Sequence, residues 1–290
     1  MTEWSIKDKV CIVTGANSGL GRETALELVK MGAGRVILTC RNMESGKEAV
    51  EYIKKETAMD EDGAKEKLGL YHLDLSSLAS VRKFAKEILE NEKQLDCLIE
   101  NAGVLPLKKK TLTKDGLELA FGTNHVGHFL LVQLLLDLMK KSEQARIVVV
   151  ASKYYFQTAP DGFHIDDVNY EKTNYTYLDA YAQSKLANIL FARELDRRLK
   201  ADSNGNSSTI SVFSLHPGII HTNMGRNLPG YMKWMFKTLM RMRLIRGGCS
   251  VEDGIKTTIN CATKPGIEKF SGQYFSFEKS VNLQKKNFKI

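Results

Sequence analysis

Thr14-Gly15-Ala16-Asn17-Ser18-Gly19-Leu20-Gly21 is the stretch that decides the fold, because it follows an apolar run, Val10-Cys11-Ile12-Val13, and precedes an amphipathic segment. A strand that breaks at glycines and resumes as a helix presents free backbone N–H groups, and the positive end of the helix dipole, to an anion. Gly15 permits the sharp turn, Gly19 a close ligand approach, and Gly21 close packing of helix on strand. The spacing G-x-x-x-G-x-G is a variant of the usual dinucleotide-binding turn; a glycine-rich turn without a ligand is the alternative.

Strand-like and helix-like segments alternate along the whole chain. Apolar runs of strand length occur at 10–14, 35–39, 70–73, 96–100, 147–151 and 210–215. Segments with helical periodicity lie between them, at 20–31, 43–58, 78–91, 117–140 and 178–200. Polar surface loops are expected at 60–63 and 203–206.

This alternation predicts a mostly parallel sheet covered by helices on both faces. We expect a Rossmann-type, doubly wound α/β fold with about seven strands. No linker or repeat divides the chain, so residues 1–290 are expected to form a single domain.

Composition and charge exclude several classes of protein. The 43% hydrophobic and 26% charged content is ordinary for a soluble globular protein. The net charge of +8 is dispersed, and Lys108-Lys109-Lys110 is too short to indicate a nucleic-acid tract. The five cysteines have neither CxxC spacing nor a nearby histidine set, which predicts reduced thiols and no metal site. With no signal peptide, and an apolar stretch at 129–139 too short to span a bilayer, we expect a cytoplasmic location.

Tyr181 and Lys185 are the first candidate catalytic pair. They lie four positions apart in a helical segment and therefore share a face. A cation beside a phenol lowers its pKa from ~10 toward the range of a general acid or base. Ser152 follows the strand 147–151, where ligand-facing groups of an open parallel sheet gather. A surface Tyr–Lys pair and a serine that caps a helix are the alternatives.

Three further polar positions stand out. Asn101-Ala102-Gly103 ends the strand 96–100, where small residues let a cofactor lie close; an ordinary turn is the alternative. Asn124 interrupts an apolar helical pattern, so its amide needs partners, either structural or a catalytic water. Arg41 follows the second strand, where NAD-binding units commonly carry an acidic residue. A guanidinium there pairs with a 2′-phosphate and favours NADP(H); a solvent-facing arginine is the alternative.

Together these elements resemble the short-chain dehydrogenase/reductase family, in order and spacing, from residue 8 to residue 277. The resemblance implies a catalytic set of Asn124, Ser152, Tyr181 and Lys185, and no metal. It also implies a set of cofactor-binding residues, among which Asp74 and Leu75 lie beside the adenine and Thr222 near the nicotinamide carboxamide. That set is Gly15, Asn17, Ser18, Gly19, Leu20, Gly21, Arg41, Asp74, Leu75, Asn101, Ala102, Gly103, Tyr181, Lys185, Pro217, Gly218 and Thr222.

Within the family, the chain is similar to the retinol dehydrogenase branch. The matching pieces are Thr39-Cys40-Arg41-Asn42, the segments 122–129 and 182–188, and His216-Pro217-Gly218. That branch implies NADP(H) and a hydrophobic retinoid, steroid or lipid-derived carbonyl. The chain departs from the family pattern at Glu100, where asparagine is usual, and at Ala151, where serine is frequent. Many members of the branch carry an N-terminal membrane anchor, whereas this sequence starts almost directly at its first strand.

The expected activity is hydride transfer between NADP(H) and a carbonyl or alcohol on a hydrophobic substrate. In that mechanism Ser152 and Tyr181 hydrogen-bond the carbonyl oxygen, and Tyr181 donates the proton. Lys185 lowers the pKa of Tyr181, and Asn124 anchors a water that relays protons. The alternative is a non-catalytic NADP(H)-binding sensor or scaffold. No nucleic-acid partner is expected, and the family resemblance implies homo-oligomers formed through the helices 117–140 and 178–200.

The segment 228–245 is expected to be helical and to determine substrate choice. One face is apolar and adaptable, and another carries Lys233, Lys237 and Arg241. Three interpretations are open: a lid over an apolar substrate, a core-packing helix, or a basic amphipathic helix in peripheral contact with a membrane. The apolar face is formed by Met232, Met235, Phe236, Leu239 and Met240.

Overall fold

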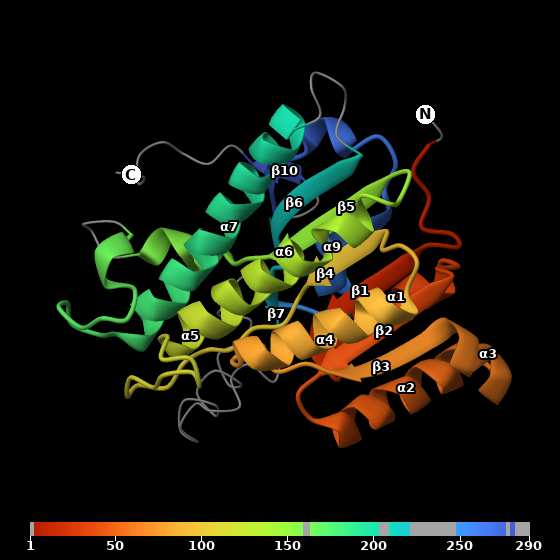
Figure 1. The fold of residues 1–290 in the computed structure, drawn as a ribbon, viewed down its shortest axis with the longest axis horizontal. Coiled ribbons are helices and arrows are strands. Elements are labelled where there is room, and N and C mark those ends of the chain that lie inside the picture. Colours follow the sequence, from red (N-terminus) through yellow and green to blue (C-terminus); the bar gives the residue numbers. More distant parts are fainter. Residues whose placement is uncertain (1–2, 159–162, 203–208, 221–247, 277–278, 282–290) are drawn as a thin grey trace.

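Eight strands form the central sheet within the part of the chain that the computed structural model describes, residues 3–158, 163–202, 209–220, 248–276 and 279–281. Their order is β10-β9-β6-β5-β4-β1-β2-β3, and β7 and β8 form a separate two-stranded sheet (Figure 1). The strands are β1 Val10–Thr14, β2 Arg35–Cys40, β3 Leu68–His72, β4 Cys97–Glu100, β5 Ala145–Val150, β6 Ile210–His216, β7 Ile219–Ile220, β8 Gly248–Cys249, β9 Tyr274–Ser276 and β10 Lys279–Val281.

Helices cover both faces of this sheet. Figure 1 shows α4, α6 and α7 side by side across one face. The α-helices are α1 Gly19–Lys30, α2 Met43–Thr57, α3 Glu61–Lys67, α4 Leu78–Asn91, α5 Leu119–Phe121, α6 Gly127–Met139, α7 Tyr177–Asp202 and α9 Val251–Thr263. The shorter helical turns are η1 Gly122–Val126, η2 Lys153–Gln157, η3 Ile165–Asp167 and η5 Glu268–Phe270.

Alternate residues of each central strand enter two separate hydrophobic cores. Cys11 and Val13 of β1 pack in the core beneath α1, α2 and α9, whereas Ile12 packs in the core beneath α4, α6 and α7. All three side chains are fully buried, as expected for a strand covered on both sides. The predicted doubly wound α/β class is therefore confirmed.

The strand order reverses at β1, which pairs in parallel with β2 on one side and β4 on the other. Open α/β sheets bind ligands outside the carboxyl ends of the strands at such a switch point, because the connections leave in opposite directions and open a crevice. The segments that begin at Gly15, Asn101 and Ala151 all leave the sheet at this edge.

The main sheet has eight strands, in agreement with the expected number of about seven. Strands β9 and β10 did not stand out in the sequence, because they are only three residues each and too short for a hydrophobic period; β10 is antiparallel to β9. One detail of the predicted fold is wrong. Residues 60–63 do not form a loop but start helix α3. The Asp60 side chain caps that helix by accepting a hydrogen bond from Gly63 N at 2.8 Å, and Glu61 and Asp62 suit the positive end of its dipole.

The helix predicted over 117–140 is interrupted by a π-helical turn, η1, between α5 and α6. Among the described residues, 119–139 is the one helical stretch that meets the length and composition of a membrane span, and half of it is buried inside the protein. Its apolar residues Leu131, Val132 and Leu135 belong to the core beneath α4, α6 and α7, which accounts for the composition. The proposed lid 228–245, the loop 203–206 and Thr222 lie outside the described residues.

Candidate active site

The glycine turn joins β1 to α1 and is packed tightly against the next strand end. Gly15 has φ +66°, which favours glycine. A Cβ on Gly21 would lie 2.4 Å from Gly15 O and 2.5 Å from Asn101 Nδ2, so no larger residue fits. The Asn101 amide donates to Thr14 O at 2.8 Å and holds the two segments together. Ser18, the N-cap of α1, makes no side-chain capping bond in the described structure, which leaves amides at that helix end for an anion.

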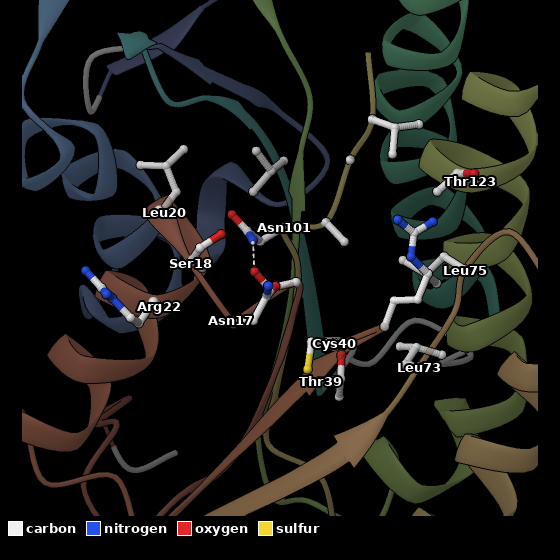
Figure 2. Close-up of a pocket in the computed structure, with 18 of the residues that line it drawn as sticks. Asn17, Ser18, Leu20, Arg22, Thr39, Cys40, Leu73, Leu75, Asn101 and Thr123 are labelled. Atoms are coloured by element: carbon white, nitrogen blue, oxygen red, sulfur yellow. Dashed lines mark hydrogen bonds between the residues drawn. The ribbon is translucent and has the colours of Figure 1, made fainter. Parts of the chain in front are cut away.

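A cavity of about 1260 Å³ opens at this edge of the sheet. Figure 2 shows it between the glycine turn on one side and Leu73 and Leu75 on the other. Every predicted cofactor-binding residue within the described part of the chain lines the cavity, and so does Ser152. Its volume exceeds the ~300–1,000 Å³ usual for small-molecule pockets, as an extended dinucleotide beside a substrate requires. The glycine cradle, the free helix end and the volume together fit such a cofactor.

The cavity is lined by Arg41 and also by a second arginine that the motif analysis missed, Arg22. The Arg22 guanidinium stacks on the Tyr52 ring at 3.8 Å and pairs with Glu23 at 2.7 Å. Arg41 is exposed and makes no ion pair with any described residue, so its charge is available to a ligand. The place of Arg22, directly after Gly21, was the available sequence signal.

The side chains of Ser152 and Tyr181, which both line the cavity, are brought together. A hydrogen bond joins the two side chains, and Ser152 Oγ also accepts from Tyr154 N at 3.1 Å. The serine therefore caps η2 as well as facing the tyrosine, which unites the two alternatives considered for it. Burial raises the pKa of Tyr181, while the hydrogen bond with Ser152 lowers it.

Lys185 lies one turn beyond Tyr181 on α7, with Nζ 5.8 Å from the centre of the Tyr181 ring. The residue is 2% exposed, and its ammonium donates to Val150 O at 2.9 Å. Burial lowers the pKa of Lys185 to about 8, and the charge of Glu100 opposes that change. The pKa of Tyr181 is thus raised by burial, contrary to the expected lowering by Lys185, and the influence that lowers it is the hydrogen bond with Ser152.

Asn124 is fully buried and uses its amide to fix the segment after β4. Its Oδ1 accepts from Val104 N at 2.7 Å, and its Nδ2 donates to Val104 O and Ser184 Oγ, both at 3.0 Å. Asn124 does not line the cavity. The hydrogen bonds of Asn124 thus fit the structural role considered for its amide, and a role of Asn124 in holding a catalytic water stays a prediction.

Aromatic side chains surround Tyr181 on the side away from the glycine turn. Tyr154 lies 6.2 Å from Tyr181 between ring centres, and Tyr155 stacks edge-on against Tyr274 at 5.5 Å. His216, at the end of β6, lines the same cavity, and burial lowers its pKa to about 4, so the ring is neutral. The three tyrosines therefore form an aromatic cluster next to Tyr181, while His216 lines the cavity itself.

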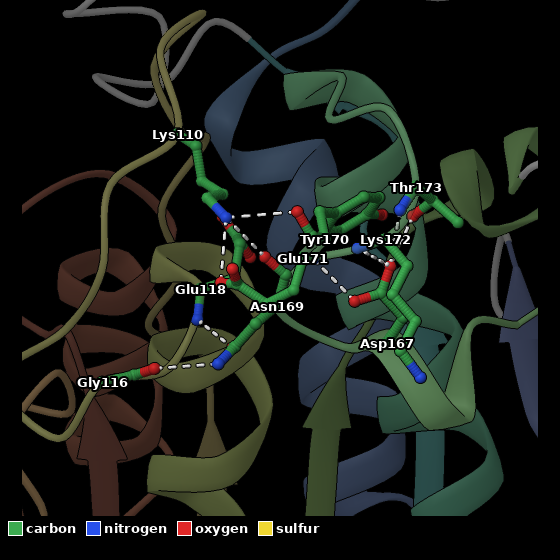
Figure 3. Close-up of polar contacts among 9 residues, drawn as sticks. All are labelled: Lys110, Gly116, Glu118, Asp167, Asn169, Tyr170, Glu171, Lys172 and Thr173. Carbon is green, nitrogen blue, oxygen red and sulfur yellow. Dashed lines mark hydrogen bonds and ion pairs between the residues drawn. The ribbon is translucent and has the colours of Figure 1, made fainter.

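The insert between Ser152 and Tyr181 is fastened to the loop before α5. Lys110 Nζ donates to Asn169 O at 3.1 Å, and Asn169 Oδ1 accepts from Glu118 N at 2.8 Å (Figure 3). Within the insert, Asp167 accepts bonds from three consecutive backbone amides and from the Thr173 hydroxyl. This network fixes the approach to α7, the helix that carries Tyr181 and Lys185.

Comparison with known proteins places this geometry in a family. Residues 9–163 match the family model described as short chain dehydrogenase. The chain belongs to the short-chain dehydrogenase family. It is 43% identical over 279 residues to retinol dehydrogenase 14 of Mus musculus, covering 95% of this chain and 79% of that one. It is 44% identical over 223 residues to retinol dehydrogenase 13 of Homo sapiens, covering 77% of this chain and 62% of that one.

Solved structures of other proteins share the fold. A protein from Mycobacterium paratuberculosis superposes with a TM-score of 0.69 at 31% identity, covering 94% of this chain and 82% of that one. A short chain dehydrogenase from Escherichia coli CFT073, solved with NADPH, superposes with a TM-score of 0.68 at 22% identity, covering 94% of this chain and 98% of that one. The chain is an oxidoreductase of a family that uses a nicotinamide cofactor.

Several lining residues of this short-chain dehydrogenase escaped prediction because they flank the motifs instead of belonging to them. Glu100 does not line the cavity; it was noticed only as a departure from the family pattern, and its proximity to Lys185 was not foreseen. The missed lining positions lie at or just after the carboxyl ends of strands β2 to β6, or in α2 and η1. They are Thr39, Cys40, Asn42, Met43, Glu44, Ser45, Glu48, Leu73, Val104, Thr123, Val150, Ala151 and His216.

Proposed function

We propose that this short-chain dehydrogenase is an NADP(H)-dependent enzyme that interconverts a carbonyl and an alcohol on a hydrophobic substrate of the retinoid, steroid or lipid-aldehyde class. The observation that carries the proposal is the single cavity that runs from the turn 14–21 past Arg41 to the hydrogen-bonded pair Ser152 and Tyr181. An anion site, a 2′-phosphate partner and a proton donor thus face one space.

The residues that hold the cofactor are proposed from their place around the cavity. Amides at the start of α1 bind the pyrophosphate, and Arg41 binds the 2′-phosphate. Asp74 and Leu75 lie beside the adenine, and Lys185 holds the nicotinamide ribose. Preference for NADP(H) is supported by the residues 39–42, which contain an arginine and no carboxylate. When bound, the cofactor supplies or accepts the hydride.

Proton chemistry rests on the chain's own hydroxyls. Ser152 and Tyr181 donate hydrogen bonds to the carbonyl oxygen, where negative charge develops during reduction. Because burial raises the pKa of Tyr181, the phenol is protonated at neutral pH and ready to act as the acid. Lys185 contributes a positive charge on the same face of α7, which stabilises the tyrosinate left after proton transfer.

The substrate class is proposed from the surroundings of Tyr181 and from the relatives. Tyr154, Tyr155 and Tyr274 do not line the cavity but form an aromatic cluster next to Tyr181, which supports an apolar substrate at that place. Relatives that are about two-fifths identical are named retinol dehydrogenases. The segment 228–245 is proposed to close over the substrate as a lid; its basic face offers the alternative of peripheral membrane contact. Homo-oligomers through α6 and α7 stay a family expectation.

Fluorescence titration of the purified protein with NADPH and with NADH tests the cofactor assignment. We expect tighter binding of NADPH and, in Arg41→Ala, a roughly 10- to 150-fold loss of NADPH affinity with little change for NADH, since hydrogen bonds to charged groups contribute about 1.5–3 kcal/mol. Arg82→Ala is the matched control, because Arg82 is an exposed arginine on α4 that does not line the cavity. Equal affinity for both cofactors would refute the role of Arg41. Binding of neither would favour a degenerate, non-catalytic protein.

A further inference from the structure

Glu100 is a buried carboxyl group that the mechanism above does not use. It is the last residue of β4, directly before Asn101, and is 1% exposed. Neither carboxyl oxygen has a hydrogen-bond partner among the described residues. A buried polar group without a partner is unfavourable for folding, so its presence beside a functional site calls for an explanation.

The side chain of Glu100 points toward the helices that carry the catalytic residues. Its register partner on β5 is Val149, and Leu98 stands two residues before it; both belong to the core beneath α4, α6 and α7. Because alternate strand residues face the same side, Glu100 faces α7 as well. Glu100 is thus paired with Val149, and the Lys185 ammonium bonds to the carbonyl of the next residue on β5, Val150.

Lys185 is the charged group that acts on this carboxyl. Each opposes the effect of burial on the other: burial raises the pKa of Glu100 to about 8 and lowers that of Lys185 to about 8, and their mutual attraction reduces both changes. They are not in ion-pair contact. The Lys185 ammonium is instead close to the strand ends, donating to Val150 O at 2.9 Å and lying 3.4 Å from the place of a Cβ on Gly103.

The other titratable groups packed around this pair keep one charge state near neutral pH. On η1 and α6, burial lowers the pKa of His125 to about 4 and that of His128 to about 3, so both rings are neutral. On α7, burial raises the pKa of Tyr181. Glu100 and Lys185 are therefore the described groups of this cluster that change charge between neutral and mildly alkaline pH.

We propose that Glu100 is a positioning residue whose carboxylate keeps Lys185 in its ammonium form inside the core. As the pH rises, Glu100 releases its proton to solvent, and the negative charge left behind holds the proton on Lys185 nitrogen. The family's usual asparagine carries no charge there, so this chain retains the lysine cation over a wider pH range. The effect on kcat rests on the proposed function, whereas the effect on the titration of Lys185 is a property of the folded protein alone.

The direct test is ¹³C NMR of lysine-labelled protein without cofactor, following the ε-carbon of Lys185, which is assigned by its absence in Lys185→Met. In Glu100→Gln we expect the titration midpoint of Lys185 to fall by about one pH unit, the lower end of the ~1–3 units caused by a nearby opposite charge, because the pair is not in contact. Glu100→Asn, with the residue usual in the family, serves if the glutamine variant does not fold. Glu118→Gln is the matched control, since Glu118 is also a fully buried glutamate but acts as a helix cap.

The second readout is the pH dependence of kcat for carbonyl reduction. The alkaline limb is expected to move to lower pH by the same amount in Glu100→Gln and to stay in place in Glu118→Gln. A merely structural role would lower kcat at every pH and leave the limb unmoved. An unchanged Lys185 midpoint in both Glu100 variants would overturn the proposal. Absence of turnover in the wild-type protein would instead overturn the proposed function, and the NMR titration would still decide the role of Glu100.

Discussion

Replacement of His128 by glutamine tests the buried hydrogen-bond chain that ties the glycine turn to Asn124. His128 is 1% exposed, with Nδ1 3.0 Å from Asn124 O and Nε2 2.9 Å from Thr14 Oγ1. Thr14 Oγ1 also accepts from Ala102 N at 2.9 Å and donates to Ile99 O at 3.4 Å. Because the carbonyl oxygen of Asn124 can only accept, the proton of the neutral ring is assigned to Nδ1, which donates to it. His128 therefore bridges β1, the segment after β4, and η1.

The expected effect of His128→Gln on stability has two parts. Loss of the Nδ1–H donor leaves Asn124 O unpaired and destabilises the protein by about 1–3 kcal/mol near neutral pH. The second part depends on pH, because burial lowers the pKa of His128 to about 3. Below pH ~6.5 the unfolded chain binds a proton that the folded chain does not, so this histidine removes about 1.4 kcal/mol of stability per pH unit as the pH falls toward the folded-state pKa. Between about pH 7.5 and pH 5 the loss is about 2 kcal/mol.

Urea unfolding of wild type and His128→Gln at several pH values measures the difference. Glutamine does not titrate, and the other buried groups titrate in both proteins, so the destabilisation by the mutation should shrink by about 2 kcal/mol between about pH 7.5 and pH 5. His72→Gln, which replaces an exposed histidine at the end of β3, should show no such change. A difference in stability that is constant with pH would refute the buried, neutral assignment of His128.

Two further substitutions probe the site. Tyr181→Phe is expected to lower kcat by about 10²–10⁴-fold while NADPH affinity is kept, because Ser152 retains its bond from Tyr154 N and only the proton donor is lost. Steady-state turnover measures kcat, and fluorescence titration measures the NADPH affinity. Unchanged turnover would contradict the mechanism. Gly21→Ala should abolish measurable NADPH binding, since its Cβ would meet Gly15 O at 2.4 Å and displace the turn. Gly63→Ala is its control, a glycine in α3 that does not line the cavity.

Much of the fold could be predicted because its signals are local. The consecutive apolar residues at 10–14 indicate a strand, and the point where the strand order reverses follows from the order of strands and helices along the chain. Elements without an apolar period were missed or misassigned. Strand β10 is held by pairing with β9, and α3 forms through the Asp60 cap and its acidic first turn, so neither needs a hydrophobic face of its own.

The candidate site was predictable only where a residue type has meaning in a fixed motif. The glycine turn, Tyr181 and Lys185 belong to that class. His128 does not, because its partner Thr14 is 114 positions away and the sequence says only that a polar ring in an apolar helix must bond to something. Glu100 is the stronger case, since a carboxylate at the end of a buried strand contradicts every local preference.

That contradiction is itself informative. A chain that folds around an unpaired carboxyl gives up stability at that position, and natural sequences retain such groups mainly where function gains from them. Glu100 stands where β4 ends, at the edge where the cofactor cavity opens, and the cation that feels its charge is Lys185. The residue that departs from the family pattern thus sits where its charge acts on the lysine of the catalytic helix. Its position relates the departure to the chemistry of the site.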